Sequence, residues 1–210
     1  YTIIYKLVNC EKFGVPQKRK RIFLIGVRDN LKIDTNILLQ EIPSTNNQSS
    51  SIREICEFSL VNAIKLDKQK FIDIIPEDKY IKAVPESKND TLGISGSIPT
   101  NLLKCYDERS NHGFSFDTRS KPTYSGVEDV DKPTHTILCA YNRMPRLFIP
   151  MKNSVGSYLR PFNIKELKQI QGFPVNYVFS GSDSSVIKQI GNAVPPIVVE
   201  TIVSRLMSYM

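Results

Sequence analysis

The chain lacks three features that would place it in specialised classes of protein. Its four cysteines lie 34 or more residues apart, which matches neither a zinc site nor a dense disulfide framework. Its longest apolar runs, such as residues 22–27, are far too short to cross a bilayer, and no charged-then-apolar leader opens the chain. We therefore expect a cytoplasmic protein with reduced thiols, no metal centre and no membrane contact.

What the chain does contain is an ordinary globular composition with an uneven charge. Hydrophobic residues make up 40% of the 210 positions and aromatic residues 9%, which excludes a disordered, collagen-like or coiled-coil protein. The net charge of +7 is concentrated, because residues 1–32 hold eight Lys and Arg against two acidic residues. A local basic cluster indicates contact with a polyanion, and a solvated basic strand is the alternative.

The basic cluster coincides with a predicted strand, turn and strand. The first run of β-forming residues ends near Gly14, and a second follows at once. A period of two puts Gln17, Arg19 and Arg21 on one face and the two intervening lysines on the other. Guanidinium groups held on a rigid strand suit a site that binds a base edge or a phosphate. Residues 22–27 are apolar on both faces, which predicts a central strand in a covered sheet.

The middle of the chain shows short, irregular periodicity. Residues 29–50 form a connector rich in Ser, Asn and Thr, and a domain boundary is expected there. Beyond it we expect helices near residues 52–60 and 66–75, and the clearest strand over residues 133–141. The Gly, Asn, Ser and Pro punctuation up to residue 160 predicts a small loop-rich unit without long helices.

The last fifty residues are sharply patterned. Asn163, followed three residues later by Glu166, predicts a helix that opens with a capping box and ends at Gly172. A second short helix is expected over residues 183–190, and the final helix starts at Pro195 and Pro196 and runs to about residue 207. The turn between the last two helices is expected to be exposed and to let backbone approach a ligand.

These residues resemble the C-terminal half of the bacterial cytosine-5 DNA methyltransferases of restriction-modification systems. Three separated blocks carry the resemblance in the family's order: residues 13–22 (FGVPQKRKRI), which contain a Gln-x-Arg-x-Arg motif, residues 159–174 (LRPFNIKELKQIQGFP) and residues 188–196 (KQIGNAVPP). Thr136 and Ile137 also stand where the family keeps a Thr-Ile type of pair in its recognition domain.

The resemblance implies an α/β fold, made of the C-terminal part of a Rossmann-like S-adenosylmethionine-dependent methyltransferase domain and a small loop-rich target-recognition domain. The implied division is a strand hairpin of the catalytic domain, a connector, the target-recognition domain, a helix that braces it, and terminal helices that return to the catalytic domain. In order, these parts are residues 1–28, 29–50, 51–160, 161–180 and 181–210.

The resemblance also implies the roles of individual residues in transferring a methyl group from S-adenosyl-L-methionine to C5 of a flipped cytosine. Arg19 and Arg21 would contact the O2 side of the base, the catalytic loop and the nearby phosphate, and Gln17 would brace them. The cofactor pocket would be lined by Asn192, Ala193 and Val194. Double-stranded DNA is the implied partner, and its contacts are expected from five residues of the recognition domain: Arg109, Arg119, Thr136, Arg143 and Arg146.

Three hallmarks of the family are absent from the sequence. There is no Pro-Cys pair to supply the nucleophile, no Phe-x-Gly-x-Gly loop for the cofactor and no Glu-Asn-Val segment. Because the chain opens inside a predicted strand, we expect it to be a fragment, inactive alone, of an enzyme that is monomeric when complete and acts at the bacterial nucleoid. The alternatives are a non-catalytic DNA-binding specificity subunit of a split methyltransferase and a related enzyme that methylates transfer RNA.

Overall fold

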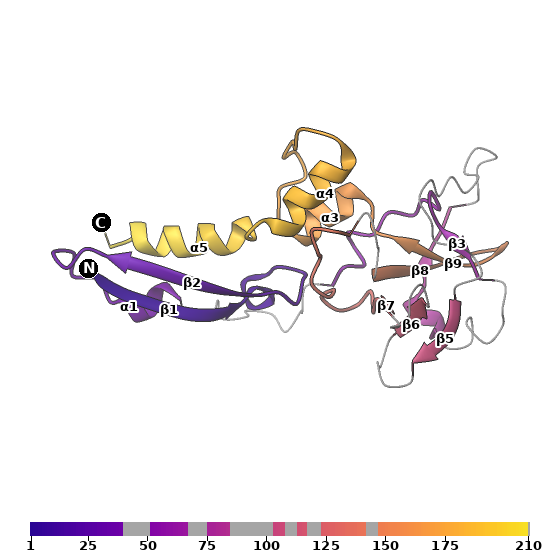
Figure 1. The fold of residues 1–210 in the computed structure, drawn as a ribbon, viewed down its shortest axis with the longest axis horizontal. Helices are drawn as coiled ribbons and strands as arrows, with labels where there is room; N and C mark the ends of the chain where they lie inside the picture. The colour runs from indigo at the N-terminus through magenta and orange to yellow at the C-terminus, as the bar shows by residue number, and fades with distance from the viewer. Residues whose placement is uncertain are drawn as a thin grey trace.

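A computed structural model describes residues 1–39, 51–66, 75–84, 103–107, 113–116, 123–141 and 147–209. The molecule is elongated (Figure 1), with a strand hairpin and the last helix at one end and a larger sheet at the other. Two helices lie between these parts. Most of the expected connector and four of the five recognition residues, Arg109, Arg119, Arg143 and Arg146, lie outside the described ranges.

The chain begins with an antiparallel hairpin, as its pattern predicts. β1 (Thr2–Asn9) pairs with β2 (Lys20–Val27) in unbroken register from Thr2 opposite Val27 to Asn9 opposite Lys20. The connection contains a 3₁₀ turn, η1 (Cys10–Phe13), which Gly14 ends with a φ of +80°. A glycine is favoured there because a side chain strains a left-handed backbone.

One face of the hairpin is covered by helix. A short helix, α1 (Thr35–Leu38), and the long final helix, α5 (Pro196–Met207), pack on it (Figure 1). Val8, Phe13, Val198 and Ile202 are among the buried residues of this small core. We call β1, β2, η1, α1 and α5 together the hairpin lobe.

The other face of the hairpin is apolar and exposed within the described residues. Tyr5 is 77% exposed, and Ile3, Leu7, Ile22 and Leu24 point the same way from the two strands. The prediction that residues 22–27 are buried on both faces was therefore wrong for this chain. The apolar pattern of residues 22–27 is still informative, because an exposed apolar face of a sheet favours contact with another element that covers it.

The second part of the molecule is a mixed sheet with two helices, which we call the sheet lobe. Its strands are ordered β3-β9-β8-β7-β6-β5, and β4 adds to β8. Most pairs are antiparallel, and β7 and β4 run parallel to β8. The elements are β3 (Ile64–Lys65), η2 (Glu77–Lys79), β4 (Ile81–Lys82), β5 (Leu103–Asp107), β6 (Gly113–Phe116), β7 (Thr123–Val127), β8 (Leu147–Asn153) and β9 (Gly156–Pro161).

Helix α3 (Ile164–Ile170) confirms the predicted capping box. The Asn163 side chain accepts from the Glu166 backbone N–H at 2.9 Å, and the Glu166 carboxylate accepts from the Asn163 N–H at 2.8 Å. The same buried carboxylate forms a two-pronged ion pair with Arg160 at 2.5 and 2.9 Å. Gly172, with a φ of +84°, follows the helix end as expected.

Helix α4 (Asp183–Asn192) corrects the expected grouping of residues 181–210. Its residues Val186, Ile187 and Ile190 belong to the core of the sheet lobe, together with Leu167 and Ile170 of α3. Only α5 returns to the hairpin, because its apolar residues face the small core instead. The physical boundary between the two lobes therefore falls at the turn between α4 and α5.

Two of the short predictions were also wrong. Residues 52–60 form turns instead of a helix, and residues 133–141 form a single bridge, Gln17 with Thr134, instead of a strand. Most of the helix expected at 66–75 lies outside the described residues. Among the described residues no single helix is long and apolar enough to span a membrane, although α4 and α5 taken as one pair, bent by 42°, pass on length and composition.

Candidate nucleic-acid interface and its buried support

The segment before β2 does not follow the flat alternation of a strand. The backbone N–H of Gln17 donates to the Val15 carbonyl at 2.7 Å, and that of Arg19 donates to the Gln17 carbonyl at 2.9 Å. Hydrogen bonds between residues i and i+2 mark γ-turns, which bend the chain at each step. Regular strand geometry begins only at Lys20.

Arg19 is fully buried at the centre of a polar network. One guanidinium nitrogen donates to the carbonyls of Gly191 and Ala193 at 2.9 and 3.0 Å, and the other donates to the Ile137 carbonyl at 3.3 Å. These carbonyls come from the end of α4 and from the segment beside the bridge at Thr134. A single side chain therefore ties together segments more than 100 residues apart in the sequence.

Gln17 and Gln171 complete this network. The Gln17 side-chain amide donates to the Gln171 side-chain oxygen at 2.7 Å, and its own oxygen accepts from the Ile137 N–H at 3.1 Å. Gln171 in turn donates to the Ala193 carbonyl at 2.6 Å. Both glutamines are fully buried, so each polar atom needs a partner inside the protein. We call Gln17, Arg19 and Gln171 the buried network.

Burial and like charge both act on Arg19. Loss of water is the larger cause and the charge of Arg21 the smaller, and together they lower the pKa of Arg19 to about 10. The guanidinium stays protonated at neutral pH and is stabilised mainly by carbonyl dipoles. Among the described residues, its Nε has no acceptor.

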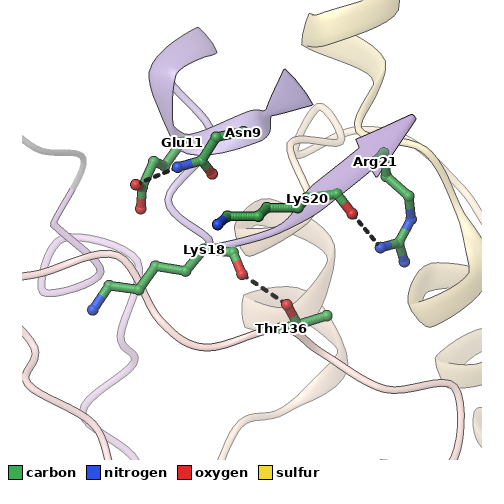
Figure 2. Close-up of a pocket in the computed structure, with 6 residues that line it drawn as sticks. All are labelled: Asn9, Glu11, Lys18, Lys20, Arg21 and Thr136. Carbon is green, nitrogen blue, oxygen red and sulfur yellow. Dashed lines mark hydrogen bonds between the residues drawn. The ribbon is translucent and has the colours of Figure 1, made fainter. Parts of the chain in front are cut away.

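A cationic hollow opens beside the buried network. It has a volume of about 490 Å³ and is lined by Asn9, Glu11, Lys18, Lys20, Arg21 and Thr136 (Figure 2). Three cationic side chains face one carboxylate there. The Thr136 hydroxyl donates to the Lys18 carbonyl at 2.7 Å and holds the segment around Thr136 against the residues that precede β2. The hollow has the charge of a site for a polyanion.

Arg21 lies on the helix-covered face of β2, in register with the buried Val8, and the exposed Lys20 lies on the opposite face, as the two-residue period predicts. Gln17 and Arg19 are buried, whereas Arg21 lines the hollow together with the two lysines. Figure 2 shows the Lys18 and Lys20 side chains running to one side of the hollow and the Arg21 side chain pointing away from them.

Gly191 allows the sheet lobe to approach this network closely. A Cβ at this position would lie 2.6 Å from the Cα and the backbone nitrogen of Cys139, so only glycine fits without a shift of the backbone. This contact brings α4 against the segment that carries Ile137. Sequence reasoning expected a close backbone approach at this turn but missed Gln171, whose only signal was its place in the Gln-Gly-Phe-Pro motif.

The expected cofactor residues lie on the turn between α4 and α5. The Ala193 carbonyl is directed inward to Arg19 and Gln171, which leaves Asn192 and Val194 exposed on either side of it. An amide and an apolar side chain set close together suit a ligand with both polar and apolar parts. Among the described residues, no group of His, Cys, Asp and Glu is placed to hold a metal ion.

Comparison with known proteins identifies the family. The model of the C-5 cytosine-specific DNA methylase family matches residues 1–208. The chain belongs to this family. The match includes the buried network, the hollow and the turn between α4 and α5, so the three sequence blocks that resembled the family meet in space as parts of one site.

Curated members of the family align with the chain along its whole length. A type II methyltransferase of Desulfomicrobium norvegicum, M.DdeI, is 22% identical and covers 100% of this chain and 55% of its own length. M.DsaV of Dactylococcopsis salina is 26% identical, with 100% and 49% covered. The chain thus spans about half the length of the curated relatives that it matches.

Solved structures show the same fold. The S. pombe Dnmt2 methyltransferase is 16% identical, with a TM-score of 0.53 over 99% of this chain and 58% of its own. A DNMT2 mutant from Spodoptera frugiperda is 16% identical, with a TM-score of 0.52 over 98% of this chain and 58% of its own. The family member described here therefore has the α/β fold of the methyltransferases.

Proposed function

We propose that the chain provides DNA recognition and catalytic support in a DNA (cytosine-5-)-methyltransferase. The observation that carries the proposal is the buried network, because Gln17, Arg19 and Gln171 join all three family blocks beside a cationic hollow. The hairpin lobe would complete the catalytic domain, and the sheet lobe would recognise the target. The nucleophile lies outside this sequence, which has no Pro-Cys pair.

The two arginines of the motif take different roles in this proposal. Arg21 lines the hollow, where its guanidinium has room for the O2 side of a flipped cytosine or a phosphate. Arg19 is a positioning residue, because its donors are engaged by carbonyls of the turn before α5 and of Ile137. The Arg19 guanidinium also donates to the Gln17 side-chain oxygen at 3.5 Å, so Gln17 supports the position of Arg19.

The cofactor and the partner in this proposal are those of the family to which the chain belongs. S-Adenosyl-L-methionine supplies the methyl group when bound, and Asn192, Ala193 and Val194 would line one side of its pocket. The network holds the Ala193 carbonyl inward and so keeps the neighbouring side chains turned outward. Double-stranded DNA would cross the hollow and the sheet lobe, with Thr136 and the arginines at 109, 119, 143 and 146 as contacts. The proposed enzyme is a monomer in the bacterial cytoplasm, at the nucleoid.

Methyl transfer to duplex DNA tests the proposal. The chain is incubated with labelled S-adenosylmethionine and duplex DNA, alone and as part of a protein that also carries the family's Pro-Cys and glycine-rich motifs. We expect label in C5 of cytosine only with the longer protein. Label incorporated by this chain alone, or by the longer protein into adenine or transfer RNA but not DNA cytosine, would contradict it.

A further inference from the structure

His135 lies next to the cationic hollow and is held by an acidic partner. Its imidazole Nδ1 lies 2.9 Å from one oxygen of the Glu128 carboxylate, and its backbone N–H donates to the other oxygen at 3.0 Å. The Glu128 side chain is 2% exposed, whereas that of His135 is 59% exposed. The imidazole is therefore fixed at its inner edge and open to solvent at its outer edge.

The carboxylate determines which ring nitrogen carries the proton. A carboxylate only accepts hydrogen bonds, so Nδ1 holds the hydrogen when the ring is neutral and Nε2 is then a bare acceptor. Among the described residues, Nε2 makes no hydrogen bond. Protonation converts Nε2 into a cationic donor, which means that only the charged ring can bind an anionic oxygen.

The surroundings of the ring indicate what kind of anion would reach it. Its neighbour Thr136 lines the hollow, and Lys18 of the hollow is close enough to act on the ring charge. The hydrogen bond that the ring donates to Glu128 raises the pKa of His135 from its ordinary value, against the smaller effects of burial and of Lys18. The nearby carboxylates of Asp129 and Asp131 are held by ion pairs with other cations instead.

We propose that protonated His135 donates from Nε2 to a backbone phosphate of duplex DNA that lies along the edge of the hollow. This rests on the proposed function, because it takes DNA as the polyanion. A phosphate bound to Lys18 and to Thr136, the neighbour of His135, would lie within the field of a second positive group only when the ring is charged. DNA affinity would then depend on pH through a single contact, which carries no sequence information.

The test is the affinity of this chain for a fluorescent duplex, measured by anisotropy between pH 5.5 and 8.5 at several salt concentrations. For the wild type we expect affinity to be roughly three- to tenfold higher at pH 5.5 than at pH 8.5. The slope of log affinity against log salt should be steeper by about one at the lower pH. Inorganic phosphate, tested as a competitor at the same concentration, should not displace the duplex.

Matched variants assign the effect to one ring. His135→Gln should remove the pH dependence, and His112→Gln, which removes the other histidine of the chain, should leave it intact. Glu128→Gln should move the midpoint to lower pH, because the neutral amide no longer favours the imidazolium. Lys18→Ala should weaken binding across the pH range and move the midpoint to higher pH, because the Lys18 charge no longer disfavours the imidazolium. Circular dichroism checks the folding of each variant.

The outcomes separate the two proposals. Duplex binding that responds to pH equally in the wild type and in His135→Gln overturns the phosphate contact and leaves the proposed function standing. Loss of the pH dependence in His112→Gln does the same. Absence of duplex binding by the wild type at every pH overturns the DNA-binding part of the proposed function, and the contact with it.

Discussion

The buried network and the cationic hollow both take residues from the same five-residue segment, and these residues meet opposite requirements. Gln17 and Arg19 are fully buried and satisfied by the protein itself, whereas Lys18, Lys20 and Arg21 line an open hollow. The comparison teaches that a shared motif need not share a role. Arg19 holds the fold together, and the neighbouring Lys18 and Lys20 line the hollow, where they can contact a ligand.

The difference has an energetic basis. A buried guanidinium needs its hydrogen-bond partners because it has lost its water, and the carbonyls that surround Arg19 likewise depend on it. An exposed cation keeps its hydration and contributes little to the free energy of unfolding. Removing each kind of residue should therefore give distinguishable results.

The largest expected effect is that of Arg19→Met. The variant removes the Arg19 donor from the carbonyls of Ile137 and Gly191 and leaves the Ala193 carbonyl with Gln171 alone, so the free energy of unfolding should fall by about 3–5 kcal/mol. Urea denaturation followed by circular dichroism measures it. The matched control, Arg21→Met, should change stability by less than about 0.5 kcal/mol. Equal losses in the two variants would contradict the division of roles.

Gly191→Ala tests how tightly the sheet lobe is held against the network. The new Cβ must displace the backbone at Cys139, and we expect the free energy of unfolding to fall by about 2 kcal/mol. Gly26→Ala is the control, since the nearest atom to its Cβ is a side-chain carbon of Tyr1 at 3.9 Å. If Gly191→Ala melts at the same temperature as the wild type, the contact between Gly191 and the Cys139 backbone is loose enough to accept a methyl group.

Alanine variants of the hollow should affect DNA and leave folding unchanged. Lys18→Ala, Lys20→Ala and Arg21→Ala should each weaken duplex binding by roughly threefold and lower the salt slope by about one. In a protein that also carries the nucleophile, Arg21→Ala should reduce turnover more than affinity, because a contact with the flipped base forms after the duplex is bound. If the loss of turnover relative to the loss of affinity is the same in Lys20→Ala as in Arg21→Ala, Arg21 makes no separate contact with the flipped base.

The smallest expected effect comes from carboxylates paired at the surface of the sheet lobe. Hydrogen bonds from Arg53 and Lys79 lower the pKa of Asp131 from 3.8 to about 2. Its contribution is present above pH 4 and is lost as the pH falls toward 2. Because Asp131 is 40% exposed, Asp131→Asn should lower the free energy of unfolding by no more than about 1 kcal/mol at pH 7. The difference in free energy of unfolding between the wild type and this variant should disappear as the pH is lowered toward 2.

Local patterns predicted the parts of this structure that depend on local contacts. The capping box at Asn163 and the final helix after Pro195 and Pro196 are set by neighbouring residues, and both were found. Gln171 was missed because its partners are Gln17 and Ala193, which no periodicity connects to it. The strand expected at residues 133–141 was not found, because this segment pairs with the distant Gln17 at a single bridge.

The candidate site shows the same limit. Family motifs grouped Arg19, Arg21 and the turn at Ala193, and these residues lie close together in the structure. The i to i+2 hydrogen bonds at Gln17 and Arg19 have no distinctive sequence signature beyond the preceding Pro16. Whether a charged side chain is buried depends on acceptors from distant segments, and those become visible only in three dimensions.

The long sequence separations within the buried network also affect how the protein is made. Arg19 pairs with carbonyls 118, 172 and 174 residues later in the chain. At a synthesis rate of about 5–20 residues per second, the last of these emerges from the ribosome roughly 10–35 s after Arg19. The hairpin must wait through that interval with its core incomplete and its apolar strands accessible to chaperones, and it acquires its native form only after Ala193 and α5 have been made.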